Sequence, residues 1–181
     1  MREQVIERIE KEKLIAIVRG VSADQCSKVA NALYAGGVRL MEITYNQKDP
    51  ASWQQTAEAI GALTEEFGGK MLFGAGTVTN VELVELTHAH GGKYIISPDT
   101  NVDVIKRTVE LGMVSLPGAM TPTEVMTAHD AGADFVKLFP VDCVDLKYIK
   151  AVRAPINHIP LLAVSGVTPE NLSLIHISEP T

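Results

Sequence analysis

Two charged residues stand inside apolar, strand-like segments of this sequence. Lys137 lies within DFVKLFP, residues 134–140, and Glu42 lies within LMEIT, residues 40–44. Burying an unpaired charge is costly, so such residues are uncommon in buried strands. Apolar surroundings lower the pKa of a lysine, whose free amine can then add to a ketone as a Schiff base, while a carboxylate nearby moves protons. The pair therefore predicts carbonyl chemistry, with Lys137 as nucleophile and Glu42 as acid–base residue.

A simpler interpretation of the same two residues is structural. The stem of Lys137 can pack among apolar side chains while its amine reaches water, and Glu42 can be its ion-pair partner. Ion pairs of this kind also shift pKa values without any catalytic role. The residue types alone leave both interpretations open.

The overall charge and hydropathy argue against several other functions. The formal net charge is −6, which disfavours binding to a nucleic-acid backbone. No apolar run approaches the roughly 20 residues of a membrane-spanning helix. The charged start MREQVIERIEKEK lacks the apolar core of a signal peptide. We therefore expect a cytoplasmic protein with no nucleic-acid partner and no membrane partner.

The histidines and cysteines show no metal-binding pattern. His88 and His90 are two residues apart, which places them on different sides of a helix, and the spacing H-x-x-x-H does not occur. Cys26 and Cys143 are far apart and form no C-x-x-C pair. We expect neither a metal nor a cofactor.

A recurring unit organises the chain. A helix-like stretch ends in glycine and an apolar strand follows almost at once, as in ALYAGGVRLMEIT and AHDAGADFVKLFP. Glycine suits the left-handed conformation that often ends a helix, and near-continuous apolar strands are typical of a parallel sheet covered on both faces. The predicted strands are 14–19, 39–44, 71–76, 93–98, 113–118, 134–139 and 161–166. The predicted helices are 23–36, 51–67, 80–90, 101–111, 121–131 and 145–152.

This alternation favours an α/β fold, a (β/α)8 TIM barrel that lacks its last strand–helix unit. Seven strands are predicted, whereas a closed barrel of this type has eight. The alternative is an open doubly wound sheet, which usually carries a G-x-G-x-x-G loop after its first strand. Here the first strand ends in VRGVSAD, and GAGTVTN after the third strand lacks the third glycine. We therefore favour the barrel, whose chemistry lies at the carboxyl ends of the strands.

The segments MEIT, GAGTV, ISPDT, PGAMTPTE and ADFVKLFP, in this order, resemble one enzyme family. It is the family of 2-keto-3-deoxy-6-phosphogluconate (KDPG) aldolases, which includes 4-hydroxy-2-oxoglutarate (KHG) aldolases. The resemblance extends from about residue 12 to about residue 171. It implies a class I, metal-independent aldolase on a (β/α)8 barrel, assembled as a homotrimer.

The resemblance also implies roles for individual residues. Lys137 matches the Schiff-base lysine, and Glu42 matches the acid–base residue. Thr77 matches a residue at the carboxylate of the pyruvate moiety, and Arg19 resembles a substrate-binding arginine found in part of the family. The remaining substrate-binding positions are two pocket walls and a phosphate-binding turn: Pro98, Phe139, Ser165 and Gly166.

The sequence departs from the family pattern in three places. Asn46 stands where some members have an arginine, which leaves Arg19 as the candidate for the carboxylate contact. Ser165–Gly166 replaces a Gly-Gly phosphate turn. After GVTPEN, where the family continues into an eighth strand, the chain reads LSLIHISEPT. We therefore expect a truncated aldolase barrel over residues 1–171 and a non-native tail over residues 172–181.

Three functional hypotheses follow. The first is cleavage of KDPG to pyruvate and glyceraldehyde 3-phosphate, with KHG as a further substrate that gives pyruvate and glyoxylate. The second is an inactive or weakly ligand-binding barrel fragment. The third is another phosphosugar enzyme on the same fold, such as an epimerase. A pyruvate adduct on Lys137, trapped by borohydride, distinguishes the first hypothesis from the other two.

Overall fold

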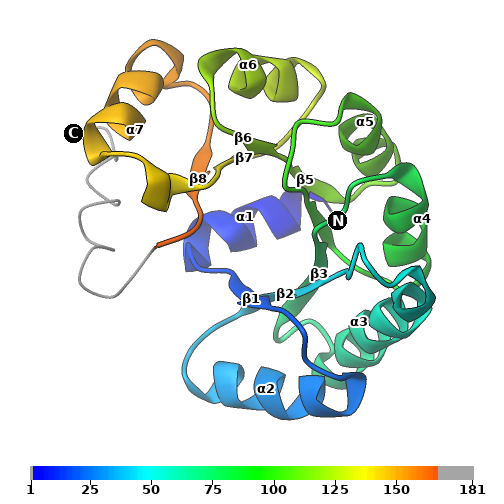
Figure 1. Cartoon of the computed structure of the whole chain (residues 1–181). Helices are drawn as coiled ribbons and strands as arrows, with labels where there is room; N and C mark the ends of the chain where they lie inside the picture. Colours follow the sequence, from blue (N-terminus) through cyan, green and yellow to red (C-terminus); the bar gives the residue numbers. More distant parts are fainter. Residues whose placement is uncertain (1, 167–181) are drawn as a thin grey trace.

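Residues 2–166 are described by a computed structural model in which parallel strands alternate with helices (Figure 1). The strands are β1 (Ala16–Val18), β2 (Leu40–Thr44), β3 (Leu72–Gly76), β4 (Tyr94–Ile96), β5 (Val114–Leu116), β6 (Gly118–Ala119), β7 (Val136–Leu138) and β8 (Leu161–Ala163). The helices are α1 (Arg2–Glu12), α2 (Ala23–Ala35), α3 (Trp53–Phe67), α4 (Val81–Ala89), α5 (Val102–Glu110), α6 (Pro122–Asp130) and α7 (Leu146–Arg153). Short 3-10 turns are η1 (Pro50–Ser52), η2 (Val141–Cys143) and η3 (Ala154–Ile156).

Each of the seven predicted strands is present, and the fifth is divided in two. Pro117 separates β5 from β6. Proline has no backbone N–H to donate, so it interrupts a strand ladder. β5 pairs with β4 and β6 pairs with β7, which gives two parallel sheets of order β1-β2-β3-β4-β5 and β6-β7-β8.

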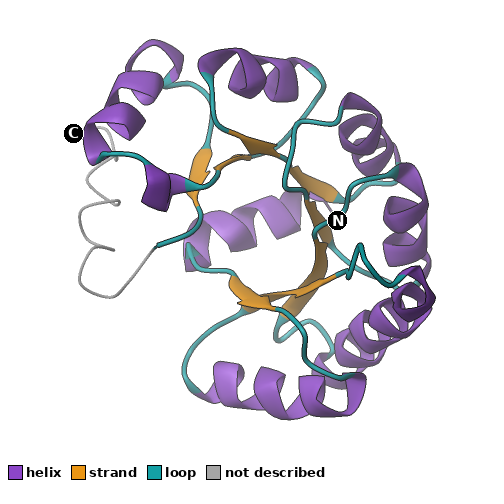
Figure 2. Cartoon of the chain, viewed as in Figure 1, coloured by secondary structure: helices purple, strands orange, loops and turns teal. Residues whose placement is uncertain are grey.

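The strands form a curved wall with helices α2 to α7 around its outer side (Figures 1 and 2). β1 and β8 stand at opposite ends of the strand order and do not pair with each other within residues 2–166. The predicted TIM-barrel architecture is confirmed, and in the described part of the chain the barrel is not closed. The predicted domain end at residue 171 and the tail 172–181 lie outside the described residues.

Helix α1 lies inside the curve of the wall and covers one end of it (Figure 1). Val5 and Ile9 on this helix are buried in a cluster with Leu40, Tyr94 and Val114. The last three are the first residues of β2, β4 and β5. The amino-terminal ends of the strands are thus covered, which leaves the carboxyl ends as the face for a functional site.

Polar side chains fix where several helices begin. At the start of α6, the Thr121 hydroxyl accepts a hydrogen bond from the Glu124 N–H, and the Glu124 carboxylate accepts one from the Thr121 N–H. Asn80 and Asn101 cap α4 and α5 through their side-chain oxygens. These starts agree with the prediction from sequence. Within residues 2–166, no helix is long and apolar enough to cross a membrane.

Candidate active site

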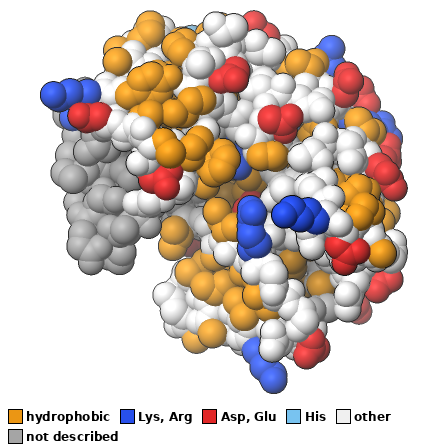
Figure 3. Space-filling model, viewed as in Figure 1, with side chains coloured by type: hydrophobic (Ala, Val, Ile, Leu, Met, Phe, Trp, Pro, Cys, Tyr) orange, Lys and Arg blue, Asp and Glu red, His pale blue; other side chains and the backbone are white. Residues whose placement is uncertain are grey.

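Lys137 and Glu42 are both buried, each at the middle of a strand. Lys137 on β7 is 8% exposed and Glu42 on β2 is 3% exposed. Each side chain acts electrostatically on the other, although their strands belong to different sheets. In the space-filling view, acidic and basic side chains lie beside a hollow near the centre of the molecule, among hydrophobic ones (Figure 3).

Glycines on the neighbouring strands make room for these groups. A Cβ atom at Gly76 would lie 2.8 Å from Cδ and Oε1 of Glu42. Gly118 on β6 pairs with Lys137 on β7. A Cβ atom at Gly118 would lie 2.4 Å from the carbonyl oxygen of Pro98, so only glycine lets the loop after β4 approach this closely. Pro98 is thereby held next to the strand position that neighbours Lys137.

The environment shifts the Glu42 carboxyl towards its protonated form. Burial raises the pKa of Glu42 to about 7, against the opposing effect of the positive charges of Lys137 and Arg19. Its Oε2 atom is buried and accepts no hydrogen bond from the described residues. A buried polar atom without a partner is uncommon, and it is free to accept one from a ligand or water. A carboxyl in this state can both take and give a proton.

The Lys137 amine is biased towards its neutral form. Burial lowers its pKa, and the charge of Glu42 acts in the opposite direction. The Nζ atom lies 4.7 Å from the centroid of the Phe139 ring, which favours the charged form. The ion pairs in the described part of the chain do not include one between Lys137 and Glu42. The simple ion-pair interpretation therefore does not describe this geometry.

Arg19 follows β1 and is exposed at the same face. Its Nη2 atom donates a 3.3 Å hydrogen bond to the Thr77 hydroxyl, which follows β3. The charge of Arg19 lowers the pKa of both Glu42 and Lys137. It thus favours the carboxylate of the first and the free amine of the second, the two forms that Schiff-base chemistry requires. The structure brings these four predicted site residues together.

Asn46 does not take the place of the missing arginine. Its side-chain oxygen accepts a 3.0 Å hydrogen bond from the Lys48 N–H, and its carbonyl oxygen accepts one of 2.9 Å from the Trp53 indole. The Asn46 amide is thus used within its own turn. Arg19 is the cation whose charge reaches the buried pair.

Ser165 and Gly166 follow β8 and both have left-handed backbone angles, with φ of 84° and 65°. Ser165, which stands in place of the first glycine of the family's Gly-Gly turn, thus adopts a conformation that glycine adopts more readily. A Cβ atom at Gly166 would lie 2.6 Å from Cβ of Asp142. The turn is therefore packed against η2, which follows Phe139.

Two residues near the site were not found from the sequence. The charge of Asp99, directly after Pro98, raises the pKa of Lys137. Gln47 donates a 2.7 Å hydrogen bond to the Thr77 carbonyl oxygen. Both are polar residues in loops, where polar residues are ordinary, so their types gave no signal. The position of Asp99 directly after a strand end was the one indication available.

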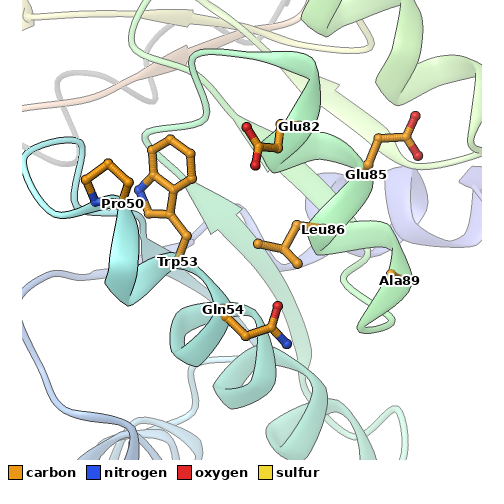
Figure 4. Close-up of a pocket in the computed structure, with 7 residues that line it drawn as sticks. All are labelled: Pro50, Trp53, Gln54, Glu82, Glu85, Leu86 and Ala89. Carbon is orange, nitrogen blue, oxygen red and sulfur yellow. The ribbon is translucent and has the colours of Figure 1, made fainter.

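A separate depression lies away from these residues. It has a volume of about 500 Å³, is open to solvent and lies between α3 and α4 (Figure 4). It is lined by Pro50, Trp53, Gln54, Glu82, Glu85, Leu86 and Ala89. None of the predicted site residues lines it, so it is not the candidate active site. No cluster of His, Cys, Asp and Glu suited to a metal ion occurs among residues 2–166.

Comparison with known proteins shows the family to which the chain belongs. Residues 5–175 match the family of KDPG and KHG aldolases. The chain is 39% identical over 164 residues to the 2-dehydro-3-deoxy-6-phosphogalactonate aldolase of Escherichia coli K12, covering 90% of this chain and 77% of that protein. The chain therefore belongs to the KDPG and KHG aldolase family, as the sequence motifs indicated.

Solved structures support the same assignment. A native KDPGal structure superposes with a TM-score of 0.82 at 37% identity, covering 91% of this chain and 77% of that one. A chain of a designed, cube-shaped protein cage built by fusing symmetric oligomeric domains superposes with a TM-score of 0.83 at 38% identity. The superposition covers 91% of this chain and 59% of that one.

Proposed function

We propose that this chain is a class I aldolase that cleaves KDPG to pyruvate and glyceraldehyde 3-phosphate through a Schiff base on Lys137. The observation that carries the proposal is the pair of buried groups, Lys137 and Glu42, which act on each other from β7 and β2. Burial is the main cause of the pKa shifts of both groups, and shifts of this kind often accompany catalysis.

The proposed reaction begins at the C2 ketone of the substrate. The Lys137 amine adds to C2, water leaves, and a protonated Schiff base forms. Glu42, acting through a water molecule, takes the proton of the C4 hydroxyl as the C3–C4 bond breaks. The bond electrons move into the iminium group, glyceraldehyde 3-phosphate leaves, and an enamine remains. Protonation at C3 and hydrolysis then release pyruvate and the free Lys137 amine.

Substrate choice depends on contacts at the two ends of the sugar acid. We propose that Arg19 and Thr77 hold the carboxylate of the pyruvate half, with Pro98 and Phe139 as walls. Ser165 and Gly166 are proposed to hold the phosphate through backbone N–H groups. KHG would share the pyruvate half, so its cleavage to pyruvate and glyoxylate is a further proposed activity.

A second candidate substrate is 2-keto-3-deoxy-6-phosphogalactonate. The Escherichia coli relative with 39% identity is named for this compound, the C4 epimer of KDPG. Both epimers present the same ketone to Lys137, so the lysine cannot distinguish them. Comparing kcat/KM for the two epimers and for KHG, by the rate of pyruvate release, identifies the preferred substrate.

Assembly is also a proposal. We propose a homotrimer, in accord with the family resemblance and with the similarity to a domain used in an oligomer-based cage design. Sedimentation of the purified chain measures this directly. The cytoplasmic location stays a prediction from sequence.

Borohydride reduction in the presence of pyruvate tests the proposed function. We expect a stable covalent adduct whose mass corresponds to one reduced pyruvate per chain, located on Lys137 by peptide mapping. The control is reduction without pyruvate, which leaves the chain unmodified. A folded chain that gains no adduct would refute the aldolase proposal and favour an epimerase or an inactive fragment.

Replacing Gly76 with alanine tests whether the position of Glu42 matters. The added Cβ atom would lie within 2.9 Å of all three carboxyl atoms of Glu42, which must move away. Displacement of a catalytic group by about 1 Å costs roughly 100-fold, so we expect kcat to fall by about 10- to 100-fold. Gly36→Ala is the control, because its added Cβ atom meets no atom closer than 3.4 Å. Equal kcat values for the two variants would argue against the proposed role of Glu42.

A further inference from the structure

We propose that Gln47 is a positioning residue that fixes Thr77 for contact with the carboxylate of the substrate. This inference rests on the proposed function. Gln47 lies in the loop after β2 and is exposed. Neither its type nor its place in the sequence distinguishes it from other polar loop residues. Its hydrogen bonds in the folded chain distinguish it from those residues.

The Gln47 side chain uses both ends of its amide to join two loops. Its Nε2 atom donates a 2.7 Å hydrogen bond to the Thr77 carbonyl oxygen. Its Oε1 atom accepts a 2.9 Å hydrogen bond from the Thr79 hydroxyl. The loop after β2 is therefore held to the loop after β3 at two points, on either side of Val78.

Thr77 needs such support because its backbone conformation is unfavourable. Its φ is +59°, in the left-handed region, which is unfavourable for a residue with a Cβ atom. The peptide group after Thr77 is held from both sides. Gln47 binds its carbonyl oxygen, and the Val78 N–H donates to the Ile96 carbonyl oxygen at 3.3 Å. Removing one of these contacts frees the peptide to rotate.

The orientation of this peptide determines where the Thr77 hydroxyl points. That hydroxyl accepts the hydrogen bond from Arg19, whose charge reaches both Glu42 and Lys137. A second link extends the support, because the Asn101 side chain donates to the Thr79 carbonyl oxygen at 3.3 Å. Gln47 thus acts on the site through Thr77 and Arg19 and does not touch the reacting atoms.

The proposed role predicts a change in substrate binding more than in chemistry. The pyruvate carboxylate stays bound from substrate to transition state, so its contacts lower KM without raising kcat. Loss of one ordinary hydrogen bond, here the bond from Gln47 to the Thr77 carbonyl oxygen, corresponds to roughly a 3- to 10-fold effect. We expect Gln47→Ala to raise KM by about 3- to 10-fold while kcat changes less than about twofold.

Three variants test this against a merely structural role. Thr79→Val keeps the side-chain shape but removes the donor to Gln47, so we expect a smaller rise in KM. Gln55→Ala makes the same chemical change at an exposed position of α3 and should leave KM unchanged. In a Thr77→Ala background, Gln47→Ala should have little additional effect, because the hydroxyl that it positions is already absent.

Pyruvate trapping separates failure of this inference from failure of the proposed function. The readout is the pyruvate concentration that gives half-maximal borohydride trapping, measured in wild type and in each variant. We expect Gln47→Ala to raise it about 3- to 10-fold, as for KM. Two results with a trapped wild type would refute only the positioning role. In the first, Gln47→Ala leaves the half-maximal pyruvate concentration unchanged. In the second, Gln47→Ala raises that concentration by the same factor in wild type and in the Thr77→Ala background. If folded wild type is not trapped, the proposed function fails, and this inference fails with it.

Discussion

Replacing Lys137 with methionine is expected to abolish both aldol cleavage and pyruvate trapping while the chain stays folded. Without the amine no Schiff base can form, and loss of a covalent nucleophile lowers the rate by roughly 10⁴- to 10⁶-fold. Methionine is similar in length to the lysine stem and leaves no charge in the buried position on β7. We therefore expect the thermal midpoint of the variant to equal or exceed that of the wild type.

Lys137→Arg is the matched control for charge. Arginine keeps a cation near the Phe139 ring but does not lose its proton, so it cannot act as a nucleophile. We expect this variant to be as inactive as Lys137→Met. Pyruvate release above background by either folded variant would show that the reaction does not pass through Lys137.

Replacing Glu42 with glutamine is expected to lower kcat by about 10²- to 10⁴-fold, the usual contribution of a general acid–base group. Glutamine has nearly the same shape as glutamate but cannot take the C4 proton. Because Lys137 is intact, the variant should still be trapped by borohydride with pyruvate. Retention of trapping with loss of cleavage separates the role of Glu42 from that of Lys137.

The pH dependence of kcat/KM provides a second measurement on the same variant. Burial raises the pKa of Glu42 to about 7, so the carboxylate gains a proton as pH falls through about 7. Its capacity as a base is then lost, and wild-type kcat/KM should fall on that acid side. In Glu42→Gln this limb should disappear. The charge of Glu42 also raises the pKa of Lys137. Removing that charge in Glu42→Gln should therefore shift the titration of Lys137 to lower pH.

Measurement of kcat/KM from about pH 5 to about pH 9 compares the two enzymes. An unchanged acid limb in Glu42→Gln would assign that titration to another group and contradict the proposed role. A limb that moves to higher pH would contradict the sign of the interaction between Glu42 and Lys137.

Most of the fold was predictable from the sequence because its signals are local. Apolar runs bounded by glycines placed the seven strands, and the helices predicted over 80–90, 101–111 and 121–131 begin where the structure shows caps. The division of the fifth strand was not predicted, although Pro117 is visible in the sequence. Which neighbour each half pairs with depends on strands far away in the chain.

The candidate site was predictable in its residue types but not in its contacts. Lys137 and Glu42 stood out because charge is rare in apolar strands. The use of the Asn46 side chain within its own turn and the bonds from Gln47 to Thr77 and Thr79 were not predictable. The partners of Gln47 belong to a loop that the fold brings beside it from about 30 residues away.

The sequence by itself determined the order of strands and helices and the two groups able to do Schiff-base chemistry. Hydrophobic periodicity and residue chemistry are properties of short segments, so one chain suffices to show them. The tertiary structure decided that Glu42 and Lys137 are both buried and close enough for the charge of each to shift the pKa of the other. It also decided that the charge of Arg19 lowers the pKa of both groups. Desolvation and Coulomb interactions depend on every strand and helix packed around a group, and no local stretch of sequence contains that information.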